Sequence, residues 1–327
     1  ATARGVPVFF RITGPWDARD ESSLSFSGRF VAVTTALVAL AIAVGVLLAW
    51  RNVRERRGDR AGALRVGLAV FILTAASQLI VADHELAPLH ELNIVRHALA
   101  QALFAGTFLC LVYLALEPHL RRRWPDRLVS WARLLSGNWR DPMVGRDILI
   151  GLLVGVLHGV LIFVASTIYN IADGAGIEPF GNVRGLAGAH QGAAKVLESA
   201  SEGIVFALIV MMILMMLTIL LRRRAIAIGA FYAMYIAILL TGSTDPGWLP
   251  WYPLLAGIVT YAVVRYGLLA AAALHFGFEI VLHFPVPDAI DWYTARTLVP
   301  LVCLLALAAW AFRTSLGDQK AFNVSLE

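Results

Sequence analysis

The stretch ILIGLLVGVLHGVLIFVASTIY, residues 148–169, contains no Asp, Glu, Lys or Arg. About 20 consecutive apolar residues are enough for a helix to cross the hydrocarbon core of a bilayer. Further apolar blocks lie before and after it, at residues 29–50, 66–82, 94–116, 193–221, 225–240, 252–264, 267–284 and 297–312. We therefore predict an all-α fold, a polytopic transmembrane helical bundle of about nine spans.

The composition supports the same class of protein. Of the 327 residues, 59% are hydrophobic and 15% are charged, whereas soluble domains contain about 45–50% apolar and about 25% charged residues. The net charge of +5 comes from arginines that lie between the apolar blocks. Such charges are typical of cytoplasmic loops, so we expect contact with membrane lipid and no nucleic-acid partner.

The arginines also predict how the chain is inserted. Clusters of arginine follow the first, third and fifth blocks, and the alternate loops carry little positive charge. The positive-inside rule then places the N-terminus outside and the C-terminus in the cytoplasm. We predict an extracytoplasmic segment at 1–28, a transmembrane domain at 29–313 and a cytoplasmic tail at 314–327. The seventh and eighth blocks could instead form one broken or re-entrant unit.

Two further patterns concern packing. Gly151, Gly155 and Gly159 recur every four residues, so they share one helix face and predict a closely approaching neighbour. Residues 126–139 mix apolar side chains with arginines, which is typical of an amphipathic helix on the cytoplasmic interface. A docking surface for a partner is the alternative interpretation of that segment.

Ionisable residues inside spans are candidates for function because they are costly to bury. Lys195, Glu198 and Glu202 have the spacing of one helix face in the fifth block. His275, Glu279 and His283 have the same property in the eighth block. The simpler interpretation is that these groups are hydrated or paired, as Lys195–Glu198 and His275–Glu279.

The alternative is an acid–base or metal site. Two histidines and a carboxylate suit zinc, which makes His275, Glu279 and His283 candidate ligands. Glu198, Glu202, His275 and Glu279 are the candidate catalytic residues of an intramembrane hydrolase of the CAAX-protease type. That type usually has a Glu-Glu pair with an Arg four residues on. Three residues separate Glu198 from Glu202 and that Arg is missing, which argues against the protease.

Other polar groups near the apolar blocks are less specific. His84, Glu85, His90 and Glu91 lie in the predicted outer loop after the second block, followed by Arg96 and His97. His158 stands alone in the fourth block, where a hydrogen bond to a neighbouring helix is the expected role. The two cysteines, Cys110 and Cys303, indicate neither a disulfide framework nor a metal motif. The sequence identifies no cofactor.

Residues 113–151, YLALEPHLRRRWPDRLVSWARLLSGNWRDPMVGRDILIG, form a long and distinctive motif. It resembles the C-terminal membrane region of large serine/threonine protein kinases of acidobacteria and related bacteria. The runs VVRYGLLAAAALHFGFEIVLHFP and AFRTSLG look like the final spans of that family, and PVFFRITGPWD resembles the end of its extracytoplasmic segment. The chain itself contains no kinase motif.

The resemblance implies a multi-pass protein of the bacterial inner membrane that acts in signalling as an anchor, a sensor or a complex subunit. Its partner would be another membrane protein or a kinase domain in the same longer chain. We expect the contact to involve the basic segment, through Arg121, Arg122, Arg123, Trp124, Arg127, Trp131, Arg133 and Arg140. Such a module needs no catalysis of its own; the hydrolase is the alternative, and a transporter is the third.

Overall fold

The computed structural model describes residues 2–3, 6–7, 43, 45–52, 54–55, 58–85, 87–172, 183–242, 247–284 and 294–317. The chain divides into two units, residues 1–41 and 42–327. In the first unit, β1 (Thr2–Ala3) pairs antiparallel with β2 (Val6–Pro7). Most of the segment predicted at 1–28, the first part of the block at 29–50 and the part of the predicted tail after residue 317 lie outside the described residues.

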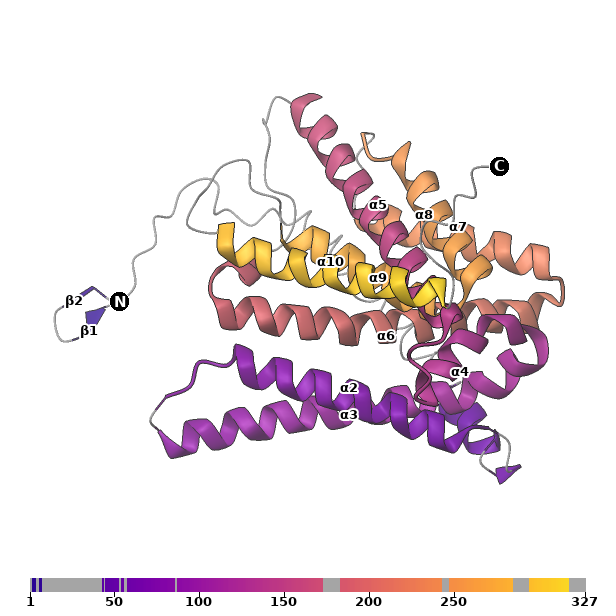
Figure 1. The fold of residues 1–327 in the computed structure, drawn as a ribbon, viewed down its shortest axis with the longest axis horizontal. Coiled ribbons are helices and arrows are strands. Elements are labelled where there is room, and N and C mark those ends of the chain that lie inside the picture. The colour runs from indigo at the N-terminus through magenta and orange to yellow at the C-terminus, as the bar shows by residue number, and fades with distance from the viewer. Residues whose placement is uncertain are drawn as a thin grey trace. The chain divides into compact units, whose positions relative to one another are not determined.

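The second unit is a helical bundle over its described residues (Figure 1). Its helices are α2 (Arg60–Val81), α3 (Pro88–Arg123), α4 (Val129–Leu135), α5 (Pro142–Ala172), α6 (Ala189–Leu221), α7 (Arg224–Gly242), α8 (Trp251–Tyr266), α9 (Leu268–His283) and α10 (Thr294–Leu316), with short 3-10 turns η2 (Pro125–Arg127) and η3 (Val183–Leu186). Residues 45–52 are helical as well. The predicted all-α membrane class is therefore confirmed.

Five of the described helices are long and apolar enough to cross a membrane, namely α2, α3, α5, α6 and α10. Helices α7 and α9 are apolar but shorter. Each predicted block from the second onward corresponds to a helix, and the seventh and eighth are separate helices, α8 and α9. Nine spans and the direction of insertion stay predictions from the sequence.

Local chemistry explains where several helices begin and end. The side chain of Asp59 accepts a hydrogen bond from the Gly62 amide at 2.8 Å and caps the start of α2. Helix α3 ends at Arg123, directly before Trp124 and Pro125. Gly267 separates α8 from α9 with a φ of 88°, in the left-handed region, and a Cβ there would run into the backbone of Arg127. A side chain at this position would be strained and would clash.

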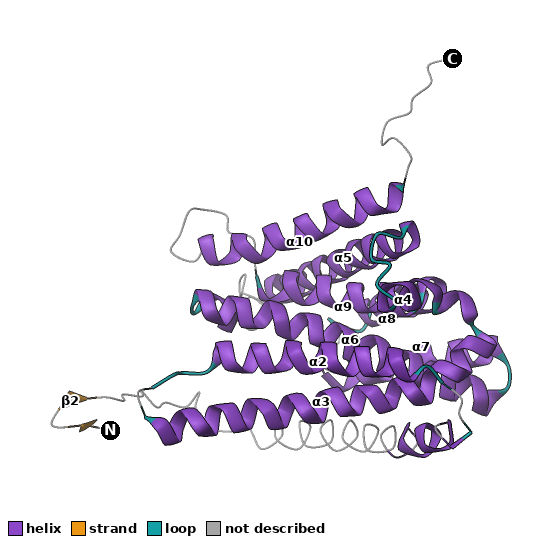
Figure 2. Ribbon diagram, turned by 60° about the horizontal axis from the view of Figure 1, so that its bottom comes forward, coloured by secondary structure: helices purple, strands orange, loops and turns teal. Residues whose placement is uncertain are grey.

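Helix α9 contacts both α5 and α6, which Figure 2 shows on either side of it. Gly151 of α5 meets Ala270 and Ala273 of α9, Gly155 meets Leu274 and Gly159 meets Val281. The close approach predicted from the four-residue glycine repeat is therefore confirmed. Helix α2 packs against α3 on one side and α6 on another.

The segment predicted as one amphipathic helix at 126–139 is shorter than expected. It consists of η2 and the two-turn helix α4, and it ends before Gly137, which has a φ of 91°. Leu128 and Trp131 are buried, and α4 contacts α2, α5 and α9. The apolar side of this segment is thus occupied by neighbouring helices of the same chain.

Candidate functional site

Three charged side chains project from one face of α6 near its start. The Lys195 ammonium Nζ lies 3.6 Å from Glu198 Oε2 and 3.2 Å from Glu202 Oε2. The spacing of three and seven residues places all of them over two consecutive helical turns. Lys195 is therefore shared between two carboxylates of its own helix.

Helix α9 brings the other half of the site. Glu279 Oε2 lies 3.1 Å from Lys195 Nζ, so an ion pair joins α9 to α6. His275 Nε2 lies 3.7 Å from Glu279 Oε1, and His283 Nδ1 lies 3.3 Å from Glu279 Oε2. His283 Nδ1 also lies 3.0 Å from the Glu279 carbonyl oxygen. We call these six residues the polar cluster: Lys195, Glu198, Glu202, His275, Glu279 and His283.

The polar cluster is only partly shielded from its surroundings. The side chains of Lys195 and Glu279 are 15% and 12% exposed, while those of Glu198 and Glu202 are 47% and 41% exposed. Three carboxylates face one ammonium, so the cluster carries net negative charge unless its imidazoles are protonated. Unpaired charges are costly in an apolar environment. The ion pair between Lys195 and Glu279, the two well-shielded side chains, therefore matters most for the stability of the cluster.

The cluster also contains a possible set of metal ligands. One ligand atom from each of Glu202, His275 and Glu279 lies within 4.8 Å of the others. The ligand set His275, Glu279 and His283 stays a prediction; Glu202 is the residue that meets this distance together with His275 and Glu279. A divalent cation would have to displace the Lys195 ammonium, which lies against the carboxylates of Glu202 and Glu279.

Aromatic rings surround the imidazoles. Phe206 of α6 stacks on His275 with the ring centres 4.6 Å apart. Phe278 lies 6.0 Å from His275 and 5.2 Å from His158. His158 of α5 is only 5% exposed, and among the described residues its Nδ1 has no hydrogen-bond partner. The sequence did not single out Phe206 and Phe278, because aromatic residues are common in any apolar helix.

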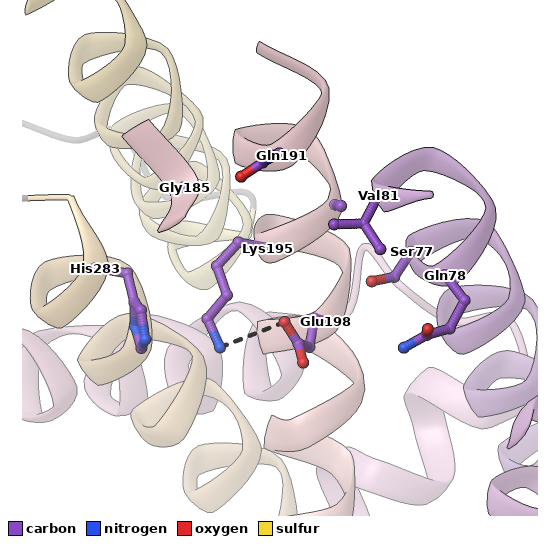
Figure 3. Close-up of a pocket in the computed structure, with 9 residues that line it drawn as sticks. Ser77, Gln78, Val81, Gly185, Gln191, Lys195, Glu198 and His283 are labelled. Atoms are coloured by element: carbon purple, nitrogen blue, oxygen red, sulfur yellow. Dashed lines mark ion pairs between the residues drawn. The ribbon is translucent and has the colours of Figure 1, made fainter. Parts of the chain in front are cut away.

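A polar pocket of about 270 Å³ opens beside Lys195 (Figure 3). Helix α2 contributes Ser77, Gln78 and Val81, and α6 contributes Gln191, Ala194, Lys195 and Glu198, with Gly185 and His283 completing the lining. Figure 3 shows the Lys195 side chain between Glu198 and His283. The spacing of ionisable groups does not indicate the uncharged residues Ser77, Gln78 and Gln191, which only the packing of α2 on α6 brings to the pocket.

The predicted outer-loop residues form a local arrangement of their own. His84 Nδ1 lies 2.9 Å from Glu91 Oε2, and the Glu85 amide donates to Glu91 Oε1 at 3.0 Å. The hydrogen bond with Glu91 raises the pKa of His84, and a bond to the Leu79 carbonyl adds to the effect. This contact links the end of α2 to the start of α3, and none of the four predicted residues belongs to the polar cluster.

Several residues of the basic segment have partners within the chain. Trp124 and Trp131 are only 5% and 4% exposed, so neither offers its ring on an open surface. Arg224 lies over the Trp124 ring, 4.7 Å from its centre. Arg121 pairs with Glu117, and Arg133 binds both carboxylate oxygens of Asp141 at 2.7 and 2.8 Å.

The remaining predicted contact residues differ in placement. Arg123 donates to the Thr218 carbonyl, and Arg140 lies over the ring of Trp139. The Arg122 side chain is exposed, and Arg127 is half-buried against Gly267. Arginines at the edge of this segment are thus more accessible to a partner than its two tryptophans.

No family model, curated protein or solved structure matches the chain. The geometry of the polar cluster therefore carries the functional argument.

Proposed function

We propose that this chain is a membrane-embedded module that senses a small polar molecule at the pocket beside Lys195. The proposal rests on the position of Lys195. Lys195 lines the pocket and at the same time forms the ion pair that joins α6 to Glu279 of α9. A ligand in the pocket can thus act on the contact between two helices.

The chemistry of the pocket defines the ligand class. Lys195 would bind the carboxylate of a small zwitterionic ligand and Glu198 its ammonium group, and the amides of Gln78 and Gln191 can both donate and accept hydrogen bonds. An anionic group on the ligand would compete with Glu279 for the ammonium. A ligand shifts a conformational equilibrium only when it binds one of the two conformations more tightly. Because the ligand competes with Glu279 for Lys195, it would bind more tightly when the ion pair between α6 and α9 is broken.

The chain has two lysines, so the test compares Lys195, in the pocket, with Lys320 as a reference. The protein in liposomes is treated with an amine-reactive ester, with and without phosphate, acetate or glycine, and acylation is quantified by mass spectrometry. We expect at least one probe to slow acylation of Lys195 relative to Lys320. Gln78→Ala should weaken this protection, whereas Gln101→Ala, outside the pocket, should not. Equal acylation with all three probes would contradict the proposal.

An intramembrane hydrolase is the second candidate, favoured by the convergence of Glu202, His275 and Glu279. A carboxylate and an imidazole could exchange protons with water, and Lys195 could stabilise a developing oxyanion. The ion pairs of Lys195 with Glu202 and Glu279 weigh against it, because they occupy one oxygen of each carboxylate that could act as a general base. The departure from the CAAX-protease motif weighs against it as well.

The hydrolase is tested with a fluorogenic peptide ending in a farnesylated CAAX sequence. Hydrolysis that is lost in Glu202→Gln and kept in Glu198→Gln, one turn away on the same helix, would support it. Absence of turnover by the unaltered protein would count against it and favour the binding module.

We further propose that the module signals to a kinase domain or another membrane protein, as the resemblance of residues 113–151 implies. The exposed Arg122 and the neighbouring arginines of the basic segment would make the contact. Reversal of Arg122 and Arg140 to Glu should reduce co-purification of the partner from native membranes. An intact mass well above 35.5 kDa from those membranes would indicate that the partner is part of the same chain.

A further inference from the structure

Three arginines that are distant in the sequence come together where several helices end. Arg127 is the last residue of η2, Arg265 lies in the last turn of α8 and Arg224 is the first residue of α7. A Cβ on Gly267, which closely follows Arg265, would run into the Arg127 backbone. Arg224 lies over the ring of Trp124, which precedes η2. We call Arg127, Arg224 and Arg265 the arginine triad.

The positive charges of the arginine triad have no counter-charge in contact with them. Within the described part of the chain, none of the three guanidinium groups forms a hydrogen bond or an ion pair. Burial lowers the pKa of Arg127, and the charges of Arg265 and Arg224 lower it further. Asp126 and Asp147 raise the same pKa, but by less. Like charges held together in this way favour a bound anion.

The N–H donors of the arginine triad are open to such an anion. A guanidinium carries five N–H donors along its edge, and a phosphate can accept two of them in parallel. The guanidinium of Arg224 lies with its carbon 4.7 Å from the centre of the Trp124 ring, and that of Arg265 lies 5.6 Å from the centre of the Tyr266 ring. A cation over an aromatic face leaves its edge free. Arg224 and Arg265 are exposed and Arg127 is half-buried, so an anion from outside the bundle can reach the triad.

Exposed apolar side chains flank the arginine triad. Leu220 ends the candidate span α6 just before Arg224, and Ile226 follows Arg224 in the first turn of α7. Tyr261 lies one turn before Arg265 on α8 and is also exposed. A free phosphate gains nothing from these side chains, whereas acyl chains would make dispersion contacts with them. Cations at the end of a span, next to exposed hydrocarbon, match the headgroup region of a phospholipid.

We infer that the arginine triad is a binding site for the phosphate group of an anionic phospholipid. A zwitterionic headgroup would bring an ammonium that three arginines repel, so the lipid should carry net negative charge. An acidic peptide also complements three arginines, but the exposed apolar side chains beside the triad favour a lipid. The site is independent of the pocket at Lys195, and it does not include Arg122 or Arg140, which are proposed to contact a partner.

The experiment measures how fast phenylglyoxal modifies each arginine. The full chain is reconstituted into phosphatidylcholine liposomes alone, with phosphatidylglycerol, with inorganic phosphate or with a polyglutamate peptide, and modification is mapped by mass spectrometry. We expect phosphatidylglycerol to slow modification of the arginine triad several-fold relative to Arg122, which is exposed. Equal slowing at Arg122 would overturn the inference, because a general attraction to the anionic surface would then explain it. Stronger protection by phosphate or polyglutamate than by phosphatidylglycerol would overturn the lipid as the occupant.

Variants test whether the three arginines act as one site. Arg127→Gln should remove most of the protection that phosphatidylglycerol gives to Arg224 and Arg265, whereas Arg122→Gln is the matched control and should keep it. Phosphatidylglycerol should also raise the unfolding temperature of the unaltered protein more than that of Arg127→Gln. Arg265→Gln, at the exposed end of α8, makes the same test if Arg127→Gln does not fold. Undiminished protection of the remaining arginines in the folded variant would contradict the site.

Discussion

The two faces of α9 are held by different forces. Toward α5, Ala270, Leu274 and Val281 pack against the backbone of glycines, and the contact depends on shape alone. Toward α6, Gly203 packs closely on the Ala272 backbone, and Glu279 meets Lys195 in an ion pair that depends on charge. A glycine-packed face tolerates no added atoms, whereas an ion pair can exchange partners. We infer that α9 is fixed where glycines pack, along α5 and at Gly203 of α6, and that its contact with α6 is adjustable around Lys195.

The largest expected effect comes from adding a methyl group to the fixed face. A Cβ on Gly155 would collide with the Leu274 carbonyl and lie 3.0 Å from the Phe278 amide nitrogen, so backbone must move. We expect Gly155→Ala to lower the free energy of unfolding by about 3 kcal/mol, as overpacking does. Denaturant titration in mild detergent measures it.

Gly229→Ala is the matched control, because within the described part of the chain no atom of another element lies within 4 Å of a Cβ at that position of α7. It should be neutral or stabilising by about 0.5–1 kcal/mol, since alanine favours a helix over glycine. Similar effects of the two substitutions would mean that the α5–α9 contact is not tightly packed.

At the adjustable contact around Lys195, Lys195→Met should lower the free energy of unfolding by about 2 kcal/mol. The loss is smaller than for breaking a fully buried ion pair, because both side chains are partly exposed. The remaining Glu279 carboxylate would lose its cation. Glu279→Gln in the same protein should recover part of the loss, which a double-mutant cycle measures as coupling. The control pair, Lys195 with Glu198, should couple more weakly because it is longer and more exposed. If the coupling energy of Lys195 with Glu198 equalled that with Glu279, the ion pair between α6 and α9 would contribute no more than the ion pair within α6.

His158→Phe tests whether the fixed face needs a polar group. The buried Nδ1 lacks a partner within the described part of the chain, so an apolar ring of similar size should change stability by less than about 1 kcal/mol. Unfolding in detergent measures this directly. A loss well above that value would show that the imidazole has a polar role on this face.

The smallest effect concerns an ion pair outside the spans. Because the pKa of His84 is raised above 6.5 by Glu91, the pair is fully formed below about pH 6.5 and is lost as the pH rises through the raised pKa. Amide exchange at residues 82–85 should therefore be slower at about pH 5.5 than at about pH 8, after correction for intrinsic rates. Glu91→Gln should abolish the difference, and stability of the α6–α9 contact should not change. A persistent difference in that variant would assign the effect to another group.

The helices were largely predictable, but their ends were not. Hydropathy begins the second span at residue 66, whereas α2 begins at Arg60, because Asp59 supplies a cap that hydropathy does not register. Helix α3 continues through Arg121, Arg122 and Arg123, since arginine favours a helix although it ends an apolar block. The prediction differed most from the structure at residues 126–139. The packing of Leu128 and Trp131 there gives η2 and the short helix α4 in place of one longer helix.

The sequence by itself determined the membrane class, the glycine face of α5 and the two charged faces on α6 and α9, because each follows from residue spacing within one helix. Only the tertiary structure decided that those charged faces meet, that Glu202 comes close to both His275 and Glu279, and that Ser77 and Gln78 of α2 complete the pocket. Helical periodicity reports the direction of a side chain from its own axis. The neighbour it meets depends on how distant helices pack, which local spacing does not encode.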